Sequence, residues 1–89
     1  MKTLMVGYDL NKPGQQYPRL IAKLKSFPKW WHYLDSTWLI KTDLGVTQVR
    51  DALWSLMDSS DELLVIDVTG DAMAWQGLPP RAGAWIKAA

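Results

Sequence analysis

The chain contains no cysteine and a single histidine, and these absences exclude several kinds of chemistry. Without cysteine there is no disulfide, no thiolate metal site and no thiol nucleophile. With His32 as the only imidazole, neither a histidine-rich zinc site nor a Ser-His-Asp triad is indicated. We therefore interpret His32, which lies among aromatic residues, as a packing or interface residue rather than a general base.

Long apolar runs are also absent. No stretch approaches the roughly 18–20 apolar residues that span a bilayer, and the first residues lack the pattern of a signal peptide. These observations predict a cytoplasmic protein with no membrane association. The glycine-rich signatures of mononucleotide and dinucleotide sites, Gly-x-x-x-x-Gly-Lys and Gly-x-Gly-x-x-Gly, are missing too, so nucleotide cofactors lack their usual signals.

Aromatic residues are plentiful by contrast. The 89 residues, enough for one domain, include six tryptophans, and 48% of the chain is hydrophobic. A chain of this size buries only about 60–65% of its unfolded surface, so a single copy is expected to be marginally stable. Part of the aromatic surface is therefore expected either to enlarge the core or to form an interface between subunits.

Charge is unevenly distributed along the chain, although the net charge is only +1. Residues 1–34 contain six cations and one acid, Asp9, whereas residues 35–75 contain eight acids and two cations. One side of the molecule is thus predicted to be basic. Such a side is either a solvated helix face or a binding patch for an anionic partner.

Periodicity divides the chain into elements. Strand-type patterns cover residues 3–9, 29–34, 37–42 and 62–68, and helical spacing covers about 15–25 and 46–57. Asp35 and Ser36 form a tight turn between two of the strands. We divide the chain into a domain, residues 1–71, and a tail, residues 72–89, which has no clean period and is predicted to dock on the sheet edge or on a partner subunit.

This order of elements predicts an α+β fold. Two split βαβ units give a ferredoxin-like βαββαβ sandwich, in which one antiparallel sheet carries two helices on one face. Right-handed crossovers place strand 3–9 at the centre, between strands 37–42 and 62–68. The other face stays open and apolar, which favours a homodimer formed through that face or an edge.

Strand alternation assigns side chains to faces. Trp31 and Tyr33 are predicted on one face of their strand, and Trp30, His32 and Leu34 on the other. The run 63–66 is continuously apolar, so its strand is predicted to be buried on both faces.

Polar side chains gather where the first strand ends. In the antiparallel sheet, Asp9 lies at the same end as the turn at Asp35 and Ser36 and the polar residues 59–62, whereas Asp67 and Asp71 lie at the opposite end. Oxygen ligands of this kind suit Mg²⁺, which often needs only one or two carboxylates. The candidate ligands are Asp9, Asn11, Asp35, Ser36 and Asp61. The alternative, which we weight more heavily, is that they are turn and capping groups that bond backbone N–H groups.

The aromatic hairpin has two interpretations. It stacks bases of a single-stranded nucleic acid on an open sheet face, or it packs in the core or a dimer interface. Only Lys29 and Lys41 supply positive charge in its two strands, which favours packing.

Three segments resemble a known family. Residues 8–14 (YDLNKPG), 30–38 (WWHYLDSTW) and 63–66 (LLVI) are similar to the small SinR-like family, and through it to the superfamily of CRISPR-associated protein two and virulence-associated protein D. The resemblance covers about residues 3–76. It implies a ferredoxin-like homodimer in which Asp9 matches the metal-binding nuclease aspartate and Ser36 matches the hairpin serine. Some relatives cleave RNA or DNA, and others act without catalysis or belong to toxin–antitoxin pairs.

Our leading hypothesis is thus a homodimeric, Mg²⁺-dependent endonuclease-like protein that acts on nucleic acid. Asp9 is the metal ligand, Ser36 orients substrate or water, and Lys12, Arg19 and Lys23 are expected to contact phosphates. The alternative is a non-catalytic dimeric interaction module, such as a CRISPR, phage-defence or toxin–antitoxin accessory protein with a partner encoded nearby.

Overall fold

The computed structural model describes residues 1–12 and 17–89. The elements in chain order are β1 (Lys2–Asp9), α1 (Tyr17–Lys25), β2 (Lys29–Leu34), β3 (Thr37–Thr42), α2 (Val46–Trp54), β4 (Glu62–Asp67) and α3 (Pro80–Ala88). The α+β class predicted from the sequence is confirmed. The expected start of the first helix near residue 15 lies outside the described residues.

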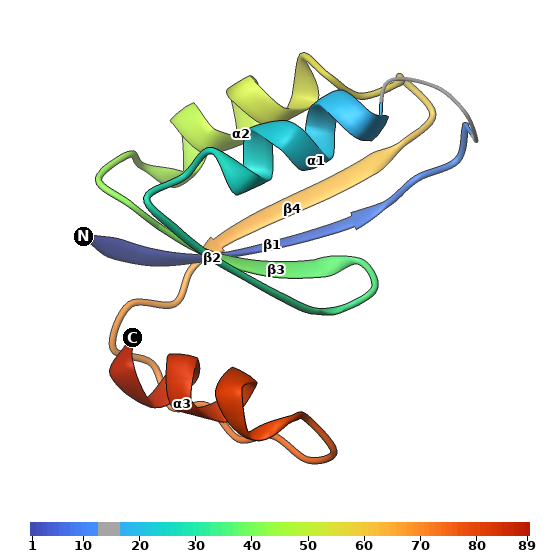
Figure 1. Cartoon of the computed structure of the whole chain (residues 1–89). Coiled ribbons are helices and arrows are strands. Elements are labelled where there is room, and N and C mark those ends of the chain that lie inside the picture. Colours follow the sequence, from blue (N-terminus) through green and yellow to red (C-terminus); the bar gives the residue numbers. More distant parts are fainter. Residues whose placement is uncertain (13–16) are drawn as a thin grey trace.

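The four strands form one antiparallel sheet in the order β2-β3-β1-β4 (Figure 1). Strand β1 is therefore central, between β3 and β4, where right-handed crossovers place it. Helices α1 and α2 lie side by side over one face, and α3 lies beneath the other (Figure 1).

The main core fills the space between the sheet and the first two helices. Alternate residues of β1 point toward the helices and are buried, as period-two alternation requires. Trp38 of β3 is fully buried there and donates from its indole Nε1 to the Tyr8 hydroxyl at 2.9 Å, which satisfies both polar groups. The buried core residues are Leu4, Val6, Tyr8, Leu20, Leu24, Phe27, Trp38, Ile40, Val49 and Leu53.

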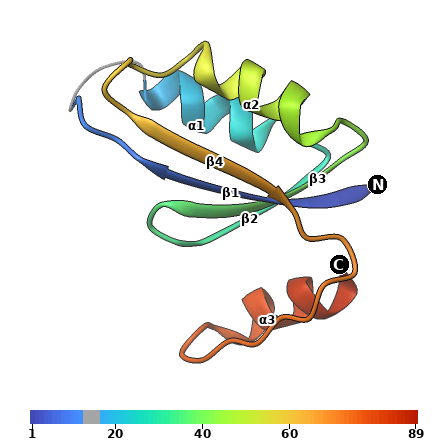
Figure 2. The same ribbon diagram turned by 180° about the vertical axis from the view of Figure 1, so that it is seen from behind.

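The tail folds back as α3 on the second face of the sheet (Figure 2). Ala82 of this helix packs against Trp31 and Leu39 in a second apolar cluster. The Trp31 indole donates to the Ala82 carbonyl at 3.2 Å. We found no clean period in the sequence of this segment, yet Ala82, Trp85 and Ile86 have helical spacing and all belong to this cluster.

Helix α2 is shorter than predicted. It ends at Trp54 rather than near residue 57. The amides of Leu56 and Met57 bond the carbonyls three residues earlier, at 2.9 and 3.0 Å, so the chain tightens into a turn at that point.

Strand β4 is not buried on both faces, and that prediction was wrong. Leu64 is 57% exposed and Ile66 is 38% exposed. The strand lies at one edge of the sheet. Helix α3 packs on the other half of the sheet, against Trp31 of β2 and Leu39 of β3, and leaves this face of β4 uncovered. A continuous apolar run therefore indicated an uncovered strand face here rather than a doubly buried strand.

The predicted face of Leu34 was also wrong. An irregularity between Trp31 and Leu34 shifts the register, so that Leu34 pairs with Thr37. Directly opposed residues share a face, and Thr37 shares its face with Leu39, the partner of Trp31. Leu34 therefore lies on the same face as Trp31, not with Trp30 and His32.

Candidate functional site

A shallow hollow of about 480 Å³ lies where β1 ends. It is on the sheet face opposite α1 and α2, next to the part covered by α3. Its polar groups come from three segments that are far apart in the sequence, as the antiparallel topology predicts. The lining residues are Gly7, Tyr8, Asp9, Ser36, Thr37, Glu62, Leu63 and Leu64.

Two carboxylates face each other across this hollow. Asp9 of β1 and Glu62 of β4 are direct cross-strand partners and share a sheet face. Both are exposed, and among the described residues neither side chain has an ion pair or hydrogen bond. Like charges placed directly opposite each other destabilise a sheet, and a bound cation relieves that repulsion.

The hairpin between β2 and β3 is fixed beside these carboxylates by the backbone. The Tyr8 amide donates to the Ser36 carbonyl at 3.1 Å, and Thr37 pairs with Gly7. Ser36 is exposed at the hollow, and its hydroxyl makes no hydrogen bond within residues 1–12 and 17–89. Gly7 has no side chain to fill the space between Asp9 and the hairpin, which leaves the floor of the hollow open.

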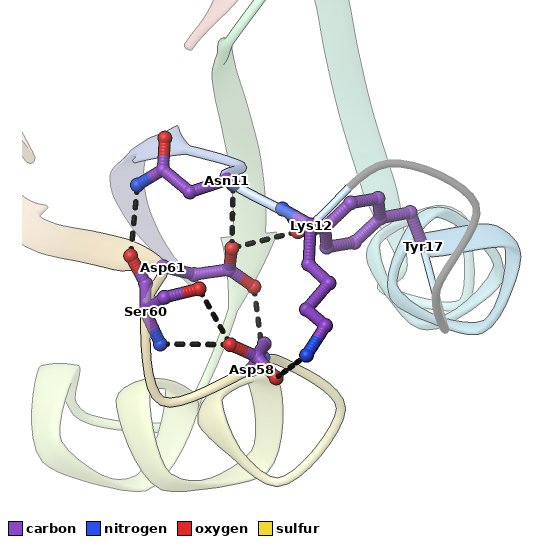
Figure 3. A network of polar contacts seen from close by, with 6 residues as sticks. All are labelled: Asn11, Lys12, Tyr17, Asp58, Ser60 and Asp61. Carbon is purple, nitrogen blue, oxygen red and sulfur yellow. Dashed lines mark hydrogen bonds and ion pairs between the residues drawn. The ribbon is translucent and has the colours of Figure 1, made fainter.

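Asp61 belongs to a different structure, a network of polar contacts on the helix side of the sheet (Figure 3). One carboxylate oxygen accepts from the Asn11 amide at 2.7 Å and from the Tyr17 hydroxyl at 2.6 Å, and the other accepts from the Asp58 amide at 2.8 Å. The Asn11 side chain donates to the Ser60 carbonyl at 2.8 Å. We call these five residues, with Lys12, the Asp61 clasp.

The clasp changes the proton affinities of its members. Burial raises the pKa of Asp61, but the hydrogen bonds from Tyr17, Asn11 and Asp58 together outweigh it and hold that pKa below its ordinary 3.8. Hydrogen bonds from Ser60 lower the pKa of Asp58. Desolvation, together with its bond to Asp61, raises the pKa of Tyr17 above 10.0.

For Asp61 the structure shows the capping alternative, since its carboxylate bonds two backbone N–H groups, whereas the Asn11 side chain donates to a backbone carbonyl. Both side chains tie the loop after β1 to the loop before β4, and the ligand atoms of Asp61 are already occupied. Asp35 does not line the hollow. Its carbonyl lies 3.1 Å from His32 Nε2, and the His32 ring stacks on Trp38 at 3.8 Å between centroids.

The three predicted phosphate contacts do not line the hollow. Lys12 forms an ion pair of 3.9 Å with Asp58 in the clasp. Arg19 and Lys23 are exposed on α1, which covers the other face of the sheet. Within one chain the sheet separates these two cations from Asp9.

Glu62 is the residue that sequence reasoning missed, because Asp61 was chosen as the ligand beside Asp9. Strand alternation alone shows that Asp61 and Glu62 cannot face the same side. Choosing between them requires the register of β1 with β4, which pairs Asp9 with Glu62.

The described residues hold no group of three or more acidic or histidine side chains able to bind a metal ion, so the hollow offers two carboxylates. No helix among residues 1–12 and 17–89 is long and apolar enough to cross a membrane. No family model, curated protein or solved structure matches the chain.

Proposed function

We propose that the protein is a Mg²⁺-dependent, endonuclease-like enzyme that acts on nucleic acid as a homodimer, with its metal site at Asp9 and Glu62. One observation carries the proposal: two exposed, unpaired carboxylates are direct cross-strand partners on an open sheet face. Mg²⁺ is a hard cation that takes oxygen ligands and keeps several waters, so this donor set fits it.

Three polar side chains of the hollow have roles in this proposal. Asp9 and Glu62 would hold the ion, and the Ser36 hydroxyl, which has no partner among the described residues, would orient a phosphate or a water. The ion supplies polarisation of the phosphodiester and acidification of a bound water. The Tyr8–Ser36 backbone bond holds the hairpin at a fixed distance from the carboxylates.

Fold and assembly belong to the same proposal. The order of elements and the central place of β1 support a ferredoxin-like fold, and the resemblance to SinR-like proteins supports a cytoplasmic homodimer. The half of the sheet that α3 leaves open presents Leu64 and Ile66 to solvent, and a second copy would cover this apolar strip.

Cleavage of fluorescently labelled single-stranded RNA and DNA tests the catalytic assignment. With Mg²⁺ or Mn²⁺ the parent chain should cleave one of them, and Asp9→Ala and Glu62→Gln should fall to the rate of buffer alone. Asp71→Ala, which removes an unpaired carboxylate elsewhere on the chain, is the matched control and should keep full activity. If Asp9→Ala cleaves as fast as the parent, the assignment is wrong.

A non-catalytic interaction module is the second candidate, and the exposed strip of Leu64 and Ile66 beside the hollow favours it. A nuclease does not need apolar residues next to its carboxylates, whereas a protein interface does. This candidate predicts no cleavage at any Mg²⁺ or Mn²⁺ concentration and a stable complex with a protein encoded nearby.

A further inference from the structure

The edge of the sheet at β2 carries a concentration of positive charge. Strand β2 contacts α1 on one side and α3 on the other (Figures 1 and 2). None of these three elements contains an acidic residue. We call the exposed basic residues along this edge, with exposed Trp30 and half-buried Tyr33, the β2-edge surface: Lys23, Lys25, Lys29, Trp30, Tyr33 and Arg81.

The cations of this surface are not neutralised by the protein. Among the described residues, Lys25, Lys29 and Arg81 make no ion pair. Lys29 lies directly opposite Lys41 of β3, a like-charge pair that destabilises the sheet. The nearest acid in sequence is Asp35, beyond the end of β2. An anionic partner would remove this repulsion.

An aromatic ring lies beside a cation on each side of this edge. The Lys25 ammonium lies 5.3 Å from the centre of the Trp30 ring, and the Arg81 guanidinium lies 5.7 Å from that of Tyr33. Trp30 is 40% exposed although Trp38, 5.5 Å away between ring centroids, is fully buried. An exposed indole beside unpaired lysines combines a surface for stacking with a partner for phosphate.

We propose that the β2-edge surface binds a single-stranded nucleic acid. Bases stack on Trp30, while Lys25, Lys29 and Arg81 contact phosphates of the backbone on the two sides of the edge. A duplex keeps its bases stacked on one another and cannot offer them to an indole, so a single strand fits this surface better. Such binding needs neither a metal ion nor Asp9, and β3 separates β2 from β1 in the sheet.

Fluorescence anisotropy of labelled dT15 and U15 tests the surface. The measurements are made in EDTA at about 50 mM salt, so that the result is independent of cleavage. We expect binding that weakens as salt rises, with a preference for both single strands over a duplex of equal length. No binding up to 1 mM protein, or tighter binding of the duplex, overturns the proposal.

A charge-matched pair of variants separates a specific surface from general attraction. Lys25→Gln/Lys29→Gln and Arg50→Glu each lower the net charge by two, and Arg50 lies on α2, where it pairs with Asp51. The double variant should bind dT15 at least about tenfold more weakly than the parent. The slope of log K against log salt concentration should become smaller in magnitude by about 1.4, because each lost phosphate contact accounts for about 0.7. Equal losses in both proteins contradict the proposal.

Stacking is tested at Trp30. Trp30→Ala should weaken dT15 binding about fivefold to a hundredfold, and Trp30→Phe should recover much of the loss. If the alanine variant does not fold, the indole N–H resonance of Trp30 in the parent chain must shift on adding dT15. An unmoved resonance, or displacement of dT15 by polyglutamate at equal ionic strength, shows a general anion-binding face and overturns the proposal.

Discussion

Two neighbouring acidic residues, Asp61 and Glu62, have opposite environments. The Asp61 carboxylate, in a residue only 5% exposed, accepts three hydrogen bonds, whereas the exposed Glu62 carboxylate beside Asp9 accepts none from the residues that the structure describes. The position and character of Asp9 could be predicted from the sequence, because a strand pattern runs into a polar turn there. Its partner could not, because cross-strand register depends on how β1 and β4 align in the folded sheet.

The Asp61 clasp should make an isosteric change costly. The Asp61 carboxylate accepts from Asn11, Tyr17 and Asp58. In Asp61→Asn one carboxylate oxygen becomes an NH₂ group, which cannot accept, so at least one of these partly buried hydrogen bonds is lost. We expect the midpoint of thermal unfolding to fall by about 5 °C or more, measured by circular dichroism. Asp71→Asn, whose carboxylate has no partner, should leave the midpoint unchanged. Equal midpoints for Asp61→Asn and the parent would contradict the clasp.

The same clasp predicts how stability depends on pH. The pKa values of Asp58 and Asp61 lie below 3.8 in the folded chain. Their contribution to the free energy of unfolding is therefore present above pH 3.8 and is lost as pH falls through the lower folded pKa values. The pKa of Tyr17 lies above 10.0, so its contribution is lost as pH rises through that higher value. The free energy of unfolding of Asp61→Asn should therefore change less with pH than that of the parent, at both the acid and the alkaline extreme.

At the scale of elements, local pattern predicted the strands better than the tail. The bounds of β2 and β3 agree with the sequence prediction, because each is a run of aromatic and β-branched residues between turn signals. Helix α3 was not predicted, because its position depends on packing against Trp31, a contact between distant parts of the chain that local pattern does not show.

Helix α3 is held against the preceding segment at a glycine. A Cβ placed on Gly83 would lie 2.8 Å from Nε1 of the Trp75 indole and 3.1 Å from two of its ring carbons. Alanine normally stabilises a helix relative to glycine by about 1 kcal/mol, but here the rigid ring must move. We expect Gly83→Ala to destabilise the protein by about 1–2 kcal/mol, measured by urea unfolding.

Making the same substitution in a Trp75→Ala chain tests whether contact with the Trp75 ring causes the destabilisation. In a Trp75→Ala chain the space beside Gly83 is open, so Gly83→Ala should become stabilising. If the substitution has the same sign in both backgrounds, contact with Trp75 is not what requires glycine at this position.

At the scale of the whole molecule, one half of the second sheet face is covered and the other is not. Helix α3 covers Trp31 and Leu39, while Leu64 and Ile66 of β4 remain exposed. The sequence indicated an apolar face in need of cover, but which strands the tail would cover depends on the strand order and on the packing of α3.

We expect a second copy to cover this strip. Light scattering should give twice the chain mass of 10.1 kDa, and Leu64→Glu/Ile66→Glu should give a monomer because it buries charge in the interface. Leu44→Glu, at an exposed leucine outside the strip, is the control and should remain dimeric. A stable monomer of the parent chain would show that the strip has another use.

The most direct test of the metal site is paramagnetic broadening by Mn²⁺, which substitutes for Mg²⁺ at oxygen ligands. At substoichiometric Mn²⁺ we predict that the amide resonances of Gly7, Ser36 and Leu64 broaden first. In Asp9→Ala and in Glu62→Gln this selective broadening should be absent. Broadening centred at Asp67, at the opposite end of the sheet, or broadening at the hollow that persists in both variants, would contradict a metal site at Asp9 and Glu62.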